Sequence, residues 1–108
     1  MPIDLSELIL TGKISKIVSI GSYEFHLETP QGNQVLDVQN GVDAAVQYVI
    51  KIVNTKDKSS EEFTTTESRL ALSKKLQGAQ AGVLTFLINA CNDLAKEQEE
   101  TIRTLSKK

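Results

Sequence analysis

The stretch that decides the fold is residues 13–29, which read KISKIVSIGSYEFHLET. β-Branched and aromatic residues lie on both sides of Gly21-Ser22, and these residue types favour strands. Glycine accepts the positive φ that the first loop position of a type II′ turn requires. The sequence therefore predicts a β-hairpin, with strands over about residues 13–20 and 23–29.

Side chains of the second strand alternate between apolar and polar. One face carries Tyr23, Phe25 and Leu27, and the other carries Glu24, His26 and Glu28. This period of two predicts one buried face and one solvated face. His26, the only histidine, is accordingly expected at the surface, where exchange for alanine should alter neither folding nor binding.

The segment after the hairpin has two interpretations. Thr29-Pro30-Gln31-Gly32 suits a β-turn before a third strand, but Thr29 and Pro30 also suit the N-cap and first position of a helix. The apolar positions advance by threes and fours, which favours a helix over residues 30–54 with a break near Asn40-Gly41; they are Val35, Val38, Val42, Ala45, Val49 and Ile52. Residues 31–40 remain open between helix and strand.

The rest of the chain predicts a loop and then helices. Residues 55–66 are polar without apolar periodicity, which is typical of a surface loop. Residues 66–105 should be helical, pausing at Gly78, with the last helix the longest. The expected fold is a single α+β domain over residues 1–108, a β-hairpin followed by three or four helices. Its core should centre on Phe25, Val49 and Leu87.

Composition excludes several classes of function. A net charge of −2 lacks the basic excess of a nucleic-acid-binding protein. No apolar run approaches the roughly 18 residues that a membrane-spanning helix needs, and the first residues lack the basic region of a signal peptide. The single Cys91 cannot form an internal disulfide, which favours a reducing cytoplasm.

No pattern of catalytic or metal-binding residues is visible. His26 has neither a second histidine nor a nearby cysteine for a metal site. Cys91 lies on an apolar helical stripe, where a buried, unreactive thiol is expected. The glycines form no phosphate-binding motif. We therefore expect a protein that is not an enzyme and binds no cofactor or metal.

The C-terminal stretch KEQEETIRTLSKK (residues 96–108) contains apolar residues among its charges. Ile102 and Leu105 continue the apolar stripe that runs through Leu94 beyond the expected body, where apolar side chains would be left in water unless something covers them. The cover is either the chain's own hairpin or another protein, and self-association could also bury the stripe. These three residues are the candidate partner-binding residues.

Three pieces of the chain together resemble small tail or baseplate assembly chaperones of long-tailed, contractile-tailed bacteriophages. They are SELILTGKISKIVSIGSYEFHLET (residues 6–29), VDAAVQYVIKIVN (42–54) and ESRLALSKKLQGAQAGVLTFLINACNDLAKEQEETI (67–102). The first resembles the family's N-terminal hairpin module, the second its apolar helix and the third its C-terminal pair of helices. The sequence departs from the family at TPQGNQVLDV (29–38), where the family is more acidic and clearly helical.

The resemblance implies a function without a cofactor. Such a chaperone would act in the host cytoplasm by transiently binding a tail component, such as the tape-measure protein or a baseplate hub protein. Two alternatives are a permanent structural protein of the tail or baseplate and a small phage regulatory protein that binds a host protein. The resemblance transfers no named binding residues.

Overall fold

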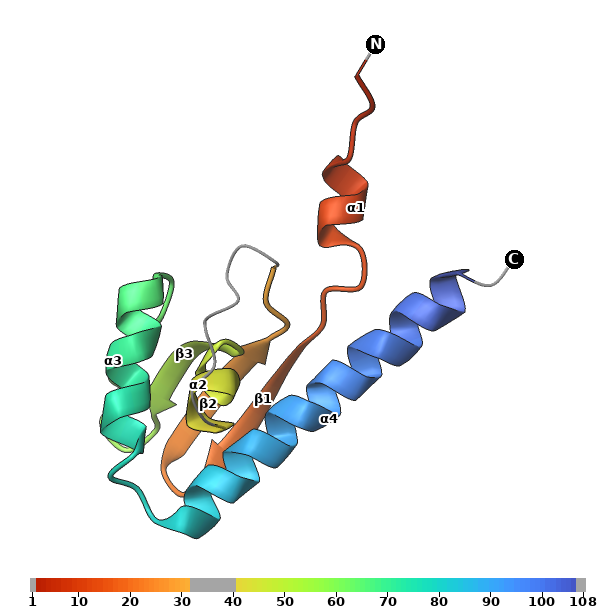
Figure 1. Ribbon diagram of the computed structural model, residues 1–108. Coiled ribbons are helices and arrows are strands. Elements are labelled where there is room, and N and C mark those ends of the chain that lie inside the picture. Colours follow the sequence, from red (N-terminus) through yellow and green to blue (C-terminus); the bar gives the residue numbers. More distant parts are fainter. Residues whose placement is uncertain (1, 32–40, 107–108) are drawn as a thin grey trace.

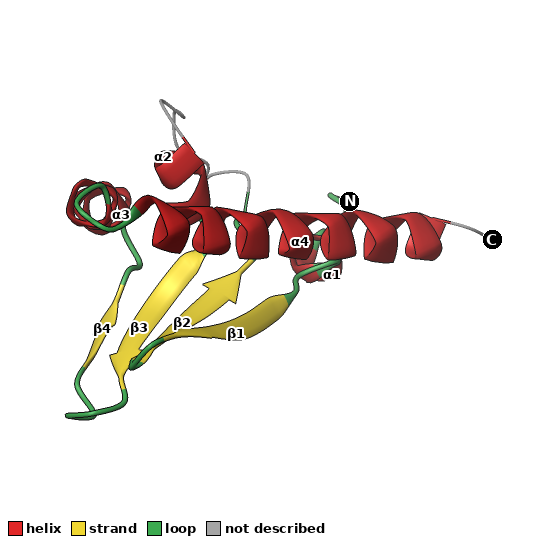
Figure 2. Cartoon of the chain, turned by 90° about the horizontal axis from the view of Figure 1, so that it is seen from below, coloured by secondary structure: helices red, strands yellow, loops and turns green. Residues whose placement is uncertain are grey.

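A computed structural model describes residues 2–31 and 41–106 (Figure 1). Its elements are α1 (Ser6–Leu10), β1 (Ser15–Ile20), β2 (Tyr23–Glu28), α2 (Gly41–Val46), β3 (Val49–Asn54), β4 (Ser60–Glu62), α3 (Thr66–Leu76) and α4 (Ala81–Ser106). The strands form one antiparallel sheet in the order β1-β2-β3-β4. Helices α2, α3 and α4 lie on one face of this sheet (Figure 2). The predicted α+β class, and a C-terminal helix longer than the others described, are confirmed.

The predicted hairpin is present. β1 pairs with β2 so that Ile20 lies opposite Tyr23, which leaves Gly21 and Ser22 as a two-residue turn. Gly21 has a φ of +59°, the left-handed conformation that glycine adopts without steric cost. The turn therefore sets the register of the first two strands.

The prediction of helix over residues 30–54 is wrong for its last part. Helix α2 ends at Val46, and the chain turns at Gln47 and Tyr48 into strand β3. Residues 49–53 include four β-branched side chains, which pack well in a sheet, and β2 offers them a free edge. The apolar residues of this segment are spaced as in a helix, but pairing with β2 makes the segment a strand. The alternatives for residues 32–40 lie outside the described residues.

The predicted loop of residues 55–66 also contains a strand. β4 is short and exposed, and it pairs with β3 through three residues. Its sequence, Ser60-Glu61-Glu62, carries no apolar signal, so only the neighbouring strand reveals it. Helix α3 then begins at Thr66, as predicted, because Thr65 accepts a hydrogen bond from the Ser68 backbone N–H and completes a capping box.

The core lies between the sheet and the helices and includes the three predicted residues Phe25, Val49 and Leu87, all buried. Leu87 and Leu94 of α4 cover the inner face of the sheet together with Val46 of α2. The core also contains a polar contact, because the Ser73 hydroxyl of α3 donates to Asp43 Oδ1 of α2 at 2.5 Å. This bond satisfies two buried polar groups and joins the two short helices.

Exchange of Leu87 for alanine tests this packing. Leu87 is 1% exposed, whereas its neighbour Phe86 is 51% exposed. Leu87→Ala should lower the free energy of unfolding by roughly 2–5 kcal/mol, and Phe86→Ala should lower it by less than about 1 kcal/mol. Urea denaturation of both variants measures the difference, and similar losses would contradict the orientation of α4.

Candidate partner-binding surface

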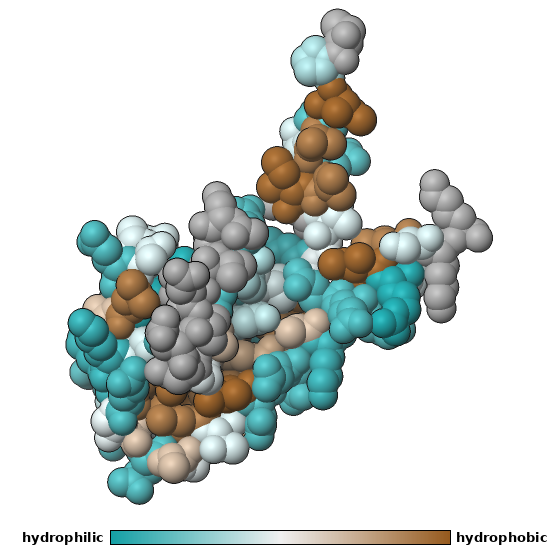
Figure 3. Space-filling view, in the orientation of Figure 1, coloured by the Kyte–Doolittle hydropathy of each residue, from teal (hydrophilic) through white to brown (hydrophobic). Residues whose placement is uncertain are grey.

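An N-terminal arm, residues 2–11, stands clear of the body near the C-terminal end of α4 (Figure 1). Helix α1 forms the middle of the arm. Its N-cap Leu5, together with Leu8 and Ile9, occupies positions i, i+3 and i+4, which lie on one helical face. With Ile3, these side chains are between 48% and 80% exposed. The space-filling view shows hydrophobic atoms along the arm (Figure 3). The arm thus presents an apolar surface that the body does not cover.

Local hydrogen bonds shape the arm. The Ser6 backbone N–H donates to Asp4 Oδ1 at 2.9 Å, and the Ser6 hydroxyl donates to the same oxygen. These bonds lower the pKa of the Asp4 carboxyl below its ordinary value, so Asp4 stays ionised at neutral pH. At the other end, the Thr11 hydroxyl donates to the Glu7 carbonyl at 2.7 Å. A five-residue helix is only marginally stable in water, so contact with another apolar surface should stabilise the arm.

Gly12 joins the arm to the body. Its φ is +81°, which turns the chain from α1 toward β1. Its missing side chain leaves room for Ile102 of α4, whose Cγ1 would lie 2.8 Å from a Cβ at this position. Gln98 Nε2 also donates to the Gly12 carbonyl at 3.3 Å. The root of the arm therefore rests against the end of α4.

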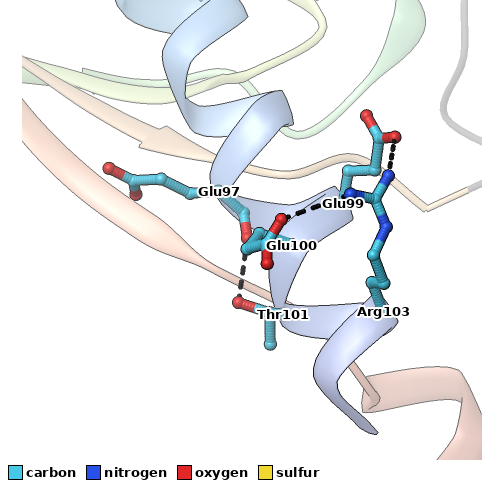
Figure 4. A network of polar contacts seen from close by, with 5 residues as sticks. All are labelled: Glu97, Glu99, Glu100, Thr101 and Arg103. Carbon is cyan, nitrogen blue, oxygen red and sulfur yellow. Dashed lines mark hydrogen bonds and ion pairs between the residues drawn. The ribbon is translucent and has the colours of Figure 1, made fainter. Parts of the chain in front are cut away.

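The last turns of α4, Gln98–Ser106, form the second part of the surface, which we call the α4 tail. Ile102 and Leu105 are 43% and 58% exposed on one side of the helix. On another side, Arg103 pairs with Glu99 at 2.8 Å and with Glu100 at 3.5 Å (Figure 4). Exposed ion pairs of this kind contribute little stability, but they give the tail a polar side distinct from its apolar side.

A cleft of about 440 Å³ lies between the arm, the tail and residues 29–31, which follow β2. Its lining includes Ile9 and Thr11 of the arm, Gln98 of the tail and Lys13 at the start of the body. Lys13 pairs with Glu28 at 2.6 Å at the edge of this region. The cleft is therefore an open, mixed polar and apolar space rather than an enclosed ligand pocket.

The three candidate partner-binding residues have different environments. Leu94 is 0% exposed and belongs to the core, so it cannot contact a partner in this structure. Ile102 and Leu105 are exposed, as a contact requires, and their role stays a prediction. The arm was not predicted from the sequence, although the spacing of Leu5, Leu8 and Ile9 beside acidic residues is typical of an amphipathic helical turn.

His26 is less exposed than expected. Its side chain is 26% exposed, and its Nε2 is buried without a hydrogen bond, 3.9 Å from Glu24 Oε1. The reason is that β2 is a central strand, so Ile17 of β1 and Lys51 of β3 flank His26 on the outer face of the sheet. In a hairpin of only two strands, the His26 side chain would be more exposed to solvent.

Cys91 lies in the core, as expected. The thiol donates to the Ala45 carbonyl at 3.5 Å, and burial raises the pKa of Cys91 to about 12. At neutral pH the thiol is therefore protonated and a poor nucleophile. Within residues 2–31 and 41–106, no group of three or more His, Cys, Asp and Glu side chains could hold a metal ion.

None of the described helices is long and apolar enough to cross a membrane. Comparison with protein-family models, curated proteins and solved structures finds no significant match to this chain.

Gly12→Ala tests the joint between arm and tail, with Gly21→Ala as its matched control. Both glycines have positive φ, but a Cβ at Gly21 would meet nothing within 4 Å. Each substitution should cost about 1–2 kcal/mol from backbone strain. Gly12→Ala should cost roughly 0.5–1.5 kcal/mol more, because its methyl group forces the half-exposed Ile102 side chain out of its rotamer.

Thermal or urea unfolding measures both costs. Adding Ile102→Ala to Gly12→Ala should recover the excess, since it removes the atoms that clash. Equal costs for Gly12→Ala and Gly21→Ala would show that the arm does not rest on the tail in solution.

Proposed function

We propose that this chain is a non-enzymatic assembly chaperone that holds an apolar segment of a partner protein until assembly consumes that partner. One observation carries the proposal: the arm and the α4 tail expose apolar side chains at the same end of the molecule. Large apolar side chains that gather in water at one end of a molecule are typical of an interaction site.

The two elements suggest how a partner segment would bind. An amphipathic helix could lie along Leu8 of the arm and Leu105 of the tail, with its polar side outward, as in helix-in-groove recognition. Burial of each such side chain contributes roughly 1.5–3 kcal/mol, and each 1.4 kcal/mol changes the dissociation constant about tenfold. Asp4 and Glu7 beside the apolar face would favour a segment with flanking basic residues.

We propose a phage tail component, the tape-measure protein or a baseplate hub protein, as the partner, and the host cytoplasm as the place of action. The support is the resemblance of residues 6–29, 42–54 and 67–102 to tail assembly chaperones. A chaperone leaves when assembly is complete, whereas a structural protein stays. Finished particles should therefore lack this chain, and its presence in them would favour a permanent tail or baseplate protein.

The binding test uses a purified phage tape-measure protein and a purified baseplate hub protein as ligands. Leu8→Asp and Leu105→Asp alter side chains that are 63% and 58% exposed, so the fold should be unaffected. Each should weaken binding at least about tenfold, because the charge would be desolvated against an apolar segment. Glu100→Ala, on the polar side of the tail, should change the affinity less than about twofold.

Affinity and thermal midpoint are measured on the same preparations. If the two aspartate variants stay folded and bind like the unaltered chain, the partner surface lies elsewhere. If neither tail protein binds the unaltered chain, the proposed partner class is wrong.

A further inference from the structure

A second apolar surface lies at the opposite end of the molecule from the arm. It is a groove of about 570 Å³ between the β1–β2 turn, the end of α3 and the start of α4. Its apolar lining consists of Ile20, Tyr23, Phe25, Ile52, Leu76 and Val83. The single charged residue that lines it in the described part of the chain is Lys75. We refer to this surface as the turn groove.

The arm matches the turn groove in size and in charge. Its apolar face is one short helical turn, a size suited to a groove lined by a few side chains. The arm carries Asp4 and Glu7 and no basic residue, whereas the groove carries Lys75 and no acidic residue. Opposite charges around matched apolar surfaces favour one orientation of docking.

The arm of the same molecule cannot reach its own turn groove. The arm joins the body just before β1, and the six residues of β1 carry the chain about 20 Å away from that point to the groove. The arm also points away from the β1–β2 turn (Figure 1). An arm that fills this groove must therefore come from a second copy.

We infer that the arm of one copy docks into the turn groove of the next, so that the chain associates head to tail with itself. A contact between two different surfaces is heterologous, and its repetition gives a ring or an open filament. Self-association of the pure protein does not depend on the proposed function. If that function is also correct, a tail protein and a second copy compete for the same arm.

Two variants test the two surfaces of the contact, the arm and the turn groove, independently. Leu8→Asp disables the arm and leaves the groove intact, and Val83→Glu disables the groove and leaves the arm intact. Sedimentation velocity of the pure, full-length chain should show association that increases with concentration, either into a closed ring of fixed size or into a filament that grows. Each variant alone should associate at least about tenfold more weakly.

An equimolar mixture of the two variants is the decisive sample. One intact arm and one intact groove remain per pair, so the mixture should form dimers with one copy of each variant and nothing larger. Circular dichroism verifies folding. If Val83→Glu fails to fold, Lys75→Glu replaces it, because Lys75 is exposed at the rim. Glu7→Lys should then restore association in the Lys75→Glu chain.

Several results would overturn the inference. They are an unaltered chain that is monomeric at all concentrations, variants that associate as strongly as the unaltered chain, and a mixture that stays monomeric. A closed dimer that neither variant weakens would also overturn it, since that dimer would form through another surface. None of these results depends on a tail protein, so they leave the test of the proposed function separate.

Discussion

The difference in length between α4 and the sheet is the constraint on which the rest of the structure depends. Helix α4 has 26 residues, which corresponds to about 39 Å. The longest described strands have six residues, or about 20 Å. Only the first part of α4 can therefore cover the sheet, and there Leu87 and Leu94 are buried. The α4 tail extends past the core whatever its side chains are.

The order of the strands determines where the arm lies. β1 is an edge strand, and α4 contacts it. The residues that precede β1 therefore leave the body beside the α4 tail, and Gly12 lets them turn sharply against Ile102. Two apolar segments from opposite ends of the chain become neighbours without belonging to the core. The same topology places the β1–β2 turn, and with it the turn groove, at the far end.

Local signals predicted the elements whose boundaries are set by local chemistry. Gly21 fixes a hairpin turn, and the capping box of Thr65 defines the start of α3 through hydrogen bonds within four residues. Strand β3 could not be predicted this way, because its apolar spacing fits a helix until the free edge of β2 is taken into account. The α+β class followed from the local signals, while the size of the sheet did not.

The candidate surface was predictable only in part for the same reason. Leu94 and Ile102 lie on one apolar stripe of the helix. Their spacing alone does not show which of the two is buried and which is exposed. One is buried and the other exposed because the sheet ends between them, which is a property of the tertiary structure. The turn groove is assembled from β1, β2, β3, α3 and α4, so no segment of the sequence announces it.

Native-state hydrogen exchange measures most directly whether the α4 tail lies outside the part of the protein that unfolds cooperatively. It is carried out at low protein concentration, so that copies are separate. Amides of the α4 tail should exchange through local opening, with a free energy far below that of global unfolding. Amides near Leu87 and Leu94 should exchange only when the whole molecule unfolds. Equal protection along all of α4 would contradict the account, because the tail would then be part of the core.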